Sequence, residues 1–319
     1  MPGLGALAGA LVVWLFFAIV AGETFRSGAG TAAYLDAAAP LGILAVAVAL
    51  LMIGGEFDLS VGSVIGFSGM ALLLLTSRFG WPLWPALGVT AALAAGIGFL
   101  NGWLVIRTRI PSFLVTLGTL FVFRGLTIGL ARAWTGRTQL GGLDDVPGYA
   151  AARALFAGDV AGFDAAILWW AGAAIVATWV LFRTPAGNWI LASGGGADAA
   201  RSQGVPVSAV KISLFVTTAL AAWLVAVLQA VRFTGTDALR GELQEFRAIA
   251  AAVIGGTLLT GGHGSPLGAS LGALVFGMVQ QGIVIIGVDA DWFQVFLGAV
   301  LLAAVVFNEW VRRHAMAAR

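Results

Sequence analysis

The 319-residue chain contains no cysteine, which excludes disulfides, thiolate metal sites and cysteine nucleophiles. Its two histidines, His263 and His314, are isolated and have no acidic residue at metal-ligand spacing, so we expect no metal site. Charged residues make up only 10% of the chain, and the net charge of +2 does not indicate a nucleic-acid partner.

Motifs of nucleotide-hydrolysing and hydrolytic enzymes are also missing. Lys211 is the only lysine and lies in VSAVKIS, so there is no GxxxxGK[ST] phosphate-binding loop and the chain is not expected to hydrolyse ATP. Neither a GxSxG elbow nor an HExxH helix occurs. The sequence therefore predicts a protein that is not an enzyme and that needs no cofactor of its own.

Apolar residues, in contrast, are abundant. They make up 60% of the chain, and the mean hydropathy is +0.98, far above what a soluble domain needs. A spanning helix takes about 20 apolar residues, and the 45 glycines suit close helix packing in lipid. We predict one all-α transmembrane domain over residues 1–319, surrounded by membrane lipid. Its candidate spans, of which the eighth is too short to cross alone, are Leu4–Ala21, Ala37–Gly54, Leu59–Leu75, Leu83–Ile106, Pro111–Ala131, Ala165–Phe182, Ile212–Val231, Ala248–Leu259, Leu267–Ile286 and Trp292–Val311.

Two polar stretches separate spans. Residues 132–164 contain Pro147 and several acids, and are expected to form an extramembrane loop. Residues 183–211 hold a glycine cluster, then ADAARSQ with helical propensity, then Gly204 and Pro206 as a helix stop. We predict a short helix there, parallel to the membrane. Lysine and arginine divide evenly between the two sides, so the positive-inside rule does not orient the chain.

Two glycine-interrupted segments look alike. MIGGEFDLSVGSVIG at 52–66 and VIGGTLLTGGHGSPLG at 253–268 each place a glycine pair at the end of an apolar run, before a polar interruption and a new helix. Corresponding interruptions in two halves of a transporter point to its substrate path. Chance similarity between glycine-rich segments is the alternative.

Polar residues within the apolar runs are candidates for lining a solute path. Glu56 and Asp58 either line the path or sit in a solvated surface loop in which Asp58 or Ser60 caps the next helix. Arg124 is equally suited to an ion pair with an intramembrane acid and to a substrate contact. The uncharged candidates are Ser60, Ser63, Asn101, Thr119, Gln280 and Gln281. For Asn101, Gln280 and Gln281 the alternative is hydrogen bonding between helices, and for Thr119 it is a bond to the backbone of its own helix.

Several stretches together resemble one family, the membrane permeases of ATP-binding-cassette importers of the ribose and simple-sugar type. GGEFDLSVGS is similar to that family's GGIDLSVGS, with one extra residue around Glu56, and PSFLVTLGTLFVFRGL resembles its threonine-rich Arg-Gly helix. GNWILASGGGADAARSQGVPVSAVK is similar to GRYIYAxGGNxxAARLSGIxVxxxK, FRAIAAAVIGGTLLTGGHGSPLGASLGAL to LDAIAAVVIGGTSLxGGxGxxxGTxxGAL, and VQQGIVIIGV to LNNGLxLLGV. The matches run in order along most of the chain.

The resemblance implies a translocation path formed by two permease chains, identical or different, an ATP-binding-cassette ATPase subunit docked on each, and an extracytoplasmic sugar-binding protein. It places residues 183–211 and both termini in the cytoplasm, residues 132–164 outside, and the protein in a bacterial cytoplasmic (inner) membrane. Arg137, Arg153 and Arg232 then become candidates for pairing with acids of the binding protein. The loop that would couple the chain to the ATPase includes Gly187, Gly195, Asp198, Ala199, Ala200, Arg201 and Gly204.

The chain departs from the family pattern at a few positions. Gly196 replaces the asparagine of the GGN triplet, Gln280 and Gln281 replace two asparagines, and Arg247 stands where aspartate is common. The expected function is ATPase-driven uptake of a monosaccharide, such as a ribose-, xylose- or galactose-like sugar or a polyol. The alternatives are a permease for branched-chain amino acids, nucleosides or a furanone signal, and an ATP-independent secondary transporter or channel in which Glu56 and Arg124 carry ion coupling.

Overall fold

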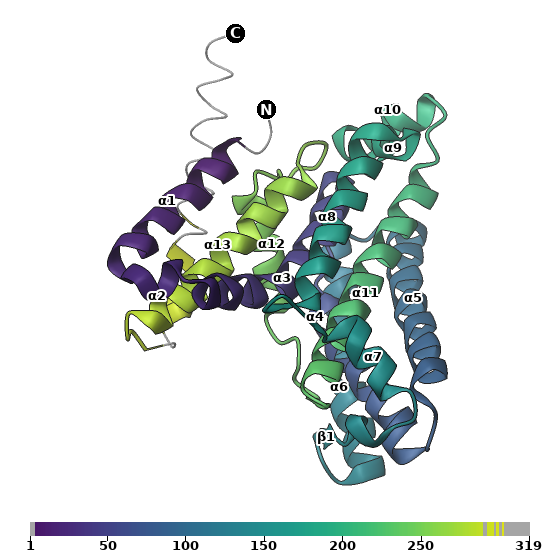
Figure 1. Cartoon of the computed structure of the whole chain (residues 1–319). Coiled ribbons are helices and arrows are strands. Elements are labelled where there is room, and N and C mark those ends of the chain that lie inside the picture. Colours follow the sequence, from purple (N-terminus) through teal and green to yellow (C-terminus); the bar gives the residue numbers. More distant parts are fainter. Residues whose placement is uncertain (1–3, 290–291, 297, 300–301, 303–319) are drawn as a thin grey trace.

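The chain is helical throughout most of the computed structural model, which describes residues 4–289, 292–296, 298–299 and 302 (Figure 1). Short strands occur only outside the long helices in this described part. The elements in chain order are α1 (Leu4–Val20), α2 (Gly22–Arg26), α3 (Gly28–Ile53), α4 (Val61–Leu73), the π-helix η1 (Leu74–Arg78), α5 (Leu83–Thr108), α6 (Ser112–Thr135), β1 (Gln139–Gly141), the 3₁₀ helix η2 (Leu143–Asp145), α7 (Tyr149–Phe156), β2 (Asp159–Val160), β3 (Phe163–Asp164), α8 (Ala165–Arg183), α9 (Pro185–Gly195), α10 (Ala197–Ser202), α11 (Val207–Arg232), β4 (Gly235–Asp237), α12 (Gln244–Ile254) and α13 (Pro266–Ile285).

Seven helices of the described part are long and apolar enough to cross a membrane, and the prediction of an all-α membrane protein is confirmed. These helices are α3, α5, α6, α8, α11, α13 and the continuous span formed by α4 with η1. Two predicted spans are shorter: α1 has 17 residues, and α12, the expected short one, has 11. The last predicted span, 292–311, lies largely outside the described residues.

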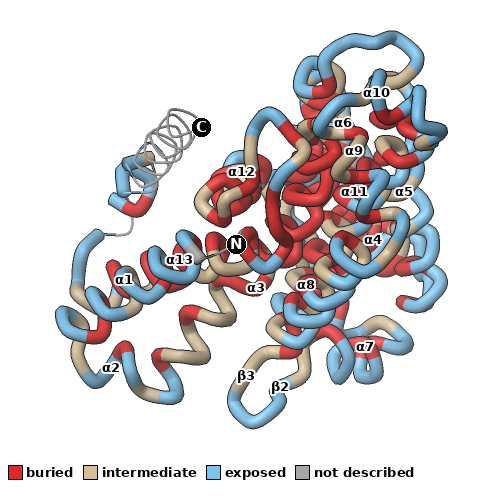
Figure 2. The backbone as a smooth tube through the Cα atoms, turned by 90° about the horizontal axis from the view of Figure 1, so that it is seen from above, coloured by how far each residue is buried: buried red, intermediate tan, exposed pale blue. Residues whose placement is uncertain are grey.

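Helix α3 lies at the centre of the bundle. It packs against α8, α11, α12 and α13, and 83% of its most apolar window is buried, compared with 22% for α6. Buried residues gather around α3, α11 and α12, whereas exposed residues follow the periphery (Figure 2). Helices α1 and α2 pack on α13 to one side of the other helices (Figure 1). The interruption that follows α3 is largely buried, whereas the one that follows α12 leaves Leu259, Thr260 and His263 exposed.

The bundle has two different ends. Helix α8 runs from Asp164 at one end, which also carries α7, to Arg183 at the other, where α9 and α10 follow (Figure 1). At the α7 end, β1 pairs antiparallel with β4 and ties residues 139–141 to 235–237. At the α9–α10 end, the predicted short helix is confirmed as α10, and the left-handed Gly204 (φ +81°) follows it. Helix α9, which begins with Pro185 in its first turn, was not predicted within the glycine-rich segment.

Glycines let the central helices approach with backbone in contact. A Cβ on Gly277 of α13 would lie 2.3 Å from the Tyr34 carbonyl oxygen of α3. A Cβ on Gly98 of α5 would lie 2.5 Å from the Phe215 carbonyl oxygen of α11. Lipid offers no hydrophobic force between helices, so this close van der Waals packing is a main source of their association.

Replacing Gly277 with alanine should therefore destabilise the bundle. The new methyl group meets backbone, which cannot turn aside, and overpacking of this kind costs about 1–3 kcal/mol. The matched control is Gly118→Ala in α6, where a Cβ meets nothing within 4 Å and alanine favours the helix by up to about 1 kcal/mol. Thermal unfolding in detergent should show a lower midpoint for Gly277→Ala only. Equal midpoints for the two variants would contradict this account of the α3–α13 contact.

Candidate functional site

The first helix interruption lies between α3 and α4. Gly54 caps α3, and Gly55 adopts the left-handed conformation (φ +84°), which glycine accepts without a Cβ clash. The Gly55 N–H donates to the Met52 carbonyl at 2.9 Å, and the Glu56 N–H donates to the Leu51 carbonyl at 3.1 Å. This pair of bonds is the Schellman motif, which satisfies the last carbonyls of a helix.

The second interruption, between α12 and α13, repeats this geometry. Gly255 caps α12, and Gly256 is left-handed (φ +87°). The N–H groups of Gly256 and Thr257 donate to the carbonyls of Val253 and Ala252, at 2.9 and 3.0 Å. The two segments that look alike in sequence therefore share one backbone conformation where their helices end.

The two interruptions contact each other, and the end of α9 contacts both. The Gly262 N–H donates to the Ile53 carbonyl at 2.8 Å, which ties the second loop to the end of α3. A Cβ on Gly194 of α9 would lie 1.8 Å from the Ile53 carbonyl oxygen and 2.7 Å from the Gly262 nitrogen. A Cβ on Gly261 would lie 2.9 Å from the Gly55 Cα. We refer to Ile53, Gly55, Gly194, Gly261 and Gly262 as the glycine junction.

Asp58 organises a buried hydrogen-bond network beside the first interruption. Its Oδ1 accepts from the Ser60 N–H at 2.9 Å and from the Ser60 hydroxyl at 2.6 Å, and its Oδ2 accepts from the Thr218 hydroxyl of α11 at 2.7 Å. Asn101 of α5 donates from Nδ2 to Ser60 Oγ at 2.9 Å, and the Ser63 hydroxyl donates to the Ser60 carbonyl at 2.7 Å. Asp58 is 1% exposed, which does not fit a solvated surface loop, and the N-cap of α4 is Ser60.

Helix α6 supplies acceptors for the backbone of the same loop. The Phe57 N–H donates to Ser112 Oγ, and the Leu59 N–H donates to Thr116 Oγ1, both at 3.0 Å. The Thr116 hydroxyl in turn donates to the Ser112 carbonyl at 2.9 Å. Because unpaired backbone groups are costly in a membrane interior, these bonds allow the chain to be non-helical here.

Glu56 lies beside the Asp58 network but has a different partner. It forms an ion pair with Lys211 of α11, and the two side chains are only 11% and 12% exposed. A cavity of about 720 Å³ at the α9–α10 end adjoins the pair, and Arg109, Asp198 and Arg201 also line it. The ion pair therefore connects the first interruption to the start of the helix that follows α10.

Arg124 forms ion pairs with acidic residues, which is the first of the two roles predicted for it. Its guanidinium lies 3.9 Å from the carboxylates of both Glu242 and Glu245. Glu245 is 1% exposed, and its Oε2 has no hydrogen-bond partner among the described residues. A Cβ on Gly62 would lie 2.0 Å from that oxygen, so the carboxylate rests on the first turn of α4, where the helix dipole favours an anion.

The predicted coupling-loop residues lie together at the α9–α10 end. Asp198 and Arg201 form an exposed ion pair at 2.6 Å on α10, and Gly204 follows that helix. Gly187 lies in the first turn of α9 against the end of α8, where a Cβ would lie 2.0 Å from the Leu181 carbonyl oxygen. The other residues of the predicted loop belong to the same two helices: Gly195 on α9, Ala199 and Ala200 on α10.

Other predicted residues lie apart from the Asp58 network. Thr119 donates to the Thr116 carbonyl of its own helix, at 3.1 Å. Gln280, Gln281 and Arg232 line a separate cavity at the α7 end.

The three arginines considered for the binding protein differ in their surroundings. Arg137 and Arg153 are exposed at the α7 end. Arg232 is already engaged within the chain, since it pairs with Asp36 at 3.5 Å and also with Asp164.

Four residues of the site were missed from sequence. Lys211 is the only lysine and stands at the start of an apolar run, which was a usable signal. Thr218 resembles any helix threonine, and Gly194 any member of a glycine cluster. Glu245 is buried although it stands in a polar stretch of the sequence between two apolar runs. Among the described residues, no three His, Asp or Glu side chains gather closely enough to hold a metal ion.

Comparisons with known proteins define the class of this chain. The family described as "branched-chain amino acid transport system / permease component" matches residues 30–305. The chain is 30% identical to the xylose transport system permease protein XylH of Escherichia coli (strain K12), over 96% of this chain and 91% of that protein. It is 30% identical to the fructose import permease protein FrcC of Rhizobium meliloti, over 93% and 82% of the two chains. It is 33% identical to the autoinducer 2 import system permease protein LsrC of Escherichia coli O9:H4 (strain HS), over 85% and 76%.

No solved structure matches the chain. The sequence matches show that the chain is a multi-pass membrane permease. It belongs to the permease family of ATP-binding-cassette importers, and it is not itself an enzyme.

Removing one partner of the Glu56–Lys211 pair should destabilise the protein more than removing both. Glu56→Gln or Lys211→Met leaves a largely buried charge unpaired, which costs about 3–5 kcal/mol. The double variant leaves no unpaired charge and should regain most of this loss, as a thermal double-mutant cycle would show. The exposed pair Asp198–Arg201 is the control, since its removal should cost at most about 1 kcal/mol. Additive losses at Glu56 and Lys211 would argue against a coupled pair.

Gly194→Ala should disrupt the glycine junction. Its methyl group would occupy the place of the Ile53 carbonyl oxygen, so α9 must move away from both interruptions. Gly118→Ala in α6 is the control, because a Cβ there meets nothing within 4 Å and the residue lies outside the predicted coupling loop. At equal membrane expression, we expect solute uptake by cells to fall at least about tenfold for Gly194→Ala. A tenfold loss requires only that the displacement of α9 cost about 1.4 kcal/mol. Equal uptake by the two variants would show that α9 can move away from the interruptions without loss of transport.

Proposed function

We propose that the chain, with a second permease chain, forms the path through which a bacterial importer takes up a neutral monosaccharide across the cytoplasmic membrane. A separate ATPase subunit binds the α9–α10 segment, and an extracytoplasmic binding protein delivers the solute at the α7 end. Both termini then lie in the cytoplasm.

The glycine junction is the observation that carries this proposal. The exposed α10 follows α9 directly, and Gly194 of α9 rests on backbone atoms of both helix interruptions. Contacting backbones have no side chain that can yield, so a movement of α9–α10 is passed on to α3 and to the loop before α13. Binding energy at the surface is thereby converted into a rigid-body movement of helices.

The choice of a sugar is supported by the named relatives and by the side chains. Permeases named for xylose and for fructose match nearly the whole chain, as does a xylose/arabinose import permease of Sulfolobus acidocaldarius. Glu56 and Arg124 are both held in ion pairs, which leaves neither free to carry a coupling ion. An ATP-driven importer of an uncharged solute therefore fits better than a secondary transporter.

Gentle solubilisation from native membranes, followed by mass spectrometry and an ATPase assay, tests the proposal. An ATPase subunit should co-purify in stoichiometric amount with the parent chain. Arg201→Glu and Gly204→Val should lower its recovery at least about tenfold, because like-charge or steric conflict at an interface costs several kcal/mol. Arg78→Glu, at the opposite end of the bundle, is the charge-matched control and should retain the subunit.

Reconstituted vesicles separate this proposal from its competitors. Uptake of D-xylose or D-fructose should require ATP hydrolysis and the binding protein. A chain that purifies alone and moves sugar without ATP would overturn the importer, and ATP-driven uptake of L-leucine in place of sugar would overturn the assigned solute.

A further inference from the structure

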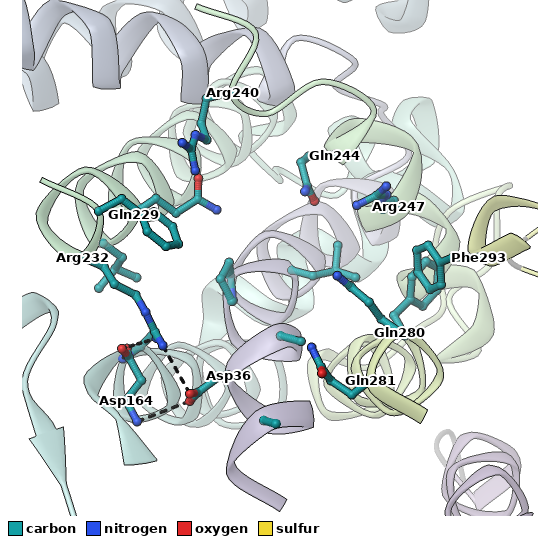
Figure 3. Close-up of a pocket in the computed structure, with 18 residues that line it drawn as sticks. Asp36, Asp164, Gln229, Arg232, Arg240, Gln244, Arg247, Gln280, Gln281 and Phe293 are labelled. Carbon is teal, nitrogen blue, oxygen red and sulfur yellow. Dashed lines mark hydrogen bonds and ion pairs between the residues drawn. The ribbon is translucent and has the colours of Figure 1, made fainter. Parts of the chain in front are cut away.

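A polar cavity opens at the α7 end, away from the Asp58 network. It has a volume of about 570 Å³ and lies between α3, α8, α11, α12 and α13 (Figure 3). This volume is within the range of roughly 300–1,000 Å³ that is typical of small-molecule sites.

The charged groups around the cavity are largely engaged with one another. Arg232 pairs with Asp36 and Asp164, which joins α11 to α3 and to the start of α8 (Figure 3). Arg240 pairs with Asp237 at 3.1 Å. Arg247 contacts an aromatic ring and has no ion pair among the described residues. An uncharged solute can bind here without breaking the existing ion pairs.

Arginine side chains at the cavity also stack on rings. The guanidinium of Arg240 lies 5.2 Å from the centre of the Phe233 ring, and that of Arg247 lies 5.5 Å from the Phe293 ring. Both distances are within the range of cation–π attraction. These contacts fix aromatic rings at the cavity wall, where they offer apolar faces to a solute.

Glutamine side chains provide the remaining polar groups. Gln229, Gln244, Gln280 and Gln281 come from three helices and surround the cavity (Figure 3). Each amide can donate two hydrogen bonds and accept others, which matches a hydroxyl group in both directions. The Oε1 of Gln229 is buried and has no partner among the described residues. An unpaired buried acceptor is costly and would be satisfied by a hydroxyl donor.

The cavity is separated from the helix interruptions by tight packing of α12 on α13. A Cβ on Gly272 would lie 2.0 Å from the Ala251 carbonyl oxygen, and one on Gly268 would lie 2.1 Å from the Gly255 carbonyl oxygen. The first contact lies between the cavity glutamines and the second interruption, and the second contact lies at that interruption. The cavity therefore does not continue between α12 and α13 to the second interruption.

We propose that this cavity is a binding site for a neutral, hydroxyl-rich solute of monosaccharide size, held by glutamine amides before the α12–α13 contact opens. The site deepens the proposed function and rests on it for the direction of transport. The glutamines and phenylalanine rings thus contribute to selecting the solute within the membrane protein itself.

The absence of cysteine allows a direct test. Ala37 lines the cavity without supplying a polar group, so Ala37→Cys provides a single thiol there, and Ala33→Cys is a second reporter if that variant does not fold. Purified protein in detergent is labelled with N-ethylmaleimide in the presence of increasing D-xylose, D-fructose or L-leucine. Labelling should slow about threefold where the sugar concentration is twice its Kd, because the free fraction then falls to one third.

Three controls make the outcome specific. Ser77→Cys is exposed at the same end but lies outside the cavity, and its labelling should not change with sugar. Adding Gln229→Leu or Gln281→Leu to the reporter should remove the protection, whereas Gln203→Leu, which is exposed at the other end, should preserve it. If neither sugar slows the labelling of either reporter, the site is overturned. If L-leucine alone protects the reporters, the assigned chemistry of the solute is overturned.

The same experiment distinguishes the site from the transport proposal. Protection by sugar together with uptake that needs no ATP would retain the cavity and reject the importer. ATP-driven uptake of sugar without protection of the reporters would retain the importer and reject the cavity.

Discussion

A helix that stops inside a membrane-embedded bundle leaves backbone groups that water cannot satisfy, and the rest of this structure follows from that constraint. Two central helices stop in this way, and both use the same pair of Schellman bonds at a glycine pair. Beyond the glycines, hydroxyl groups of α6 and the carboxylate of Asp58 accept from the loop N–H groups. Asp58 thus takes the place of water as a hydrogen-bond acceptor, and this structural role explains why it is buried with no cationic partner among the described residues.

The same constraint explains why glycine, and not a larger side chain, forms the contact with α9. The bond from the Gly262 N–H to the Ile53 carbonyl is only 2.8 Å long and lies directly beneath Gly194. A side chain at this point would separate α9 from the bond that joins the interruptions. Side-chain contacts can adapt by changing rotamers, but backbone contacts cannot, so the junction moves as a unit or breaks.

Local sequence patterns predicted seven of the membrane-spanning helices, the two glycine breaks and α10, because each of these depends on hydropathy or on helix-stop residues near in sequence. Partner choice was not predictable in the same way. Lys211 is 155 residues from Glu56, and Thr218 is 160 residues from Asp58, so nothing near either acid indicates its partner. Helix α9 was missed because glycines lower helix propensity. Here tertiary packing on α3 and α11 outweighs that preference.

Helix α13 joins the two functional regions of the chain. Its first two turns follow the second interruption and pack on α12 through Gly268 and Gly272, and its last turns carry Gln280 and Gln281. A displacement that begins at the junction can reach the cavity through α13 and through α3, which carries Ile53 at the junction and Asp36 at the cavity, because helices transmit motion as rigid elements. Opening the α12–α13 contact therefore also shifts the glutamines relative to α11. In the proposed transport cycle, release of the solute and loss of its binding groups would then be one event, and the cavity would need no separate mechanism for release.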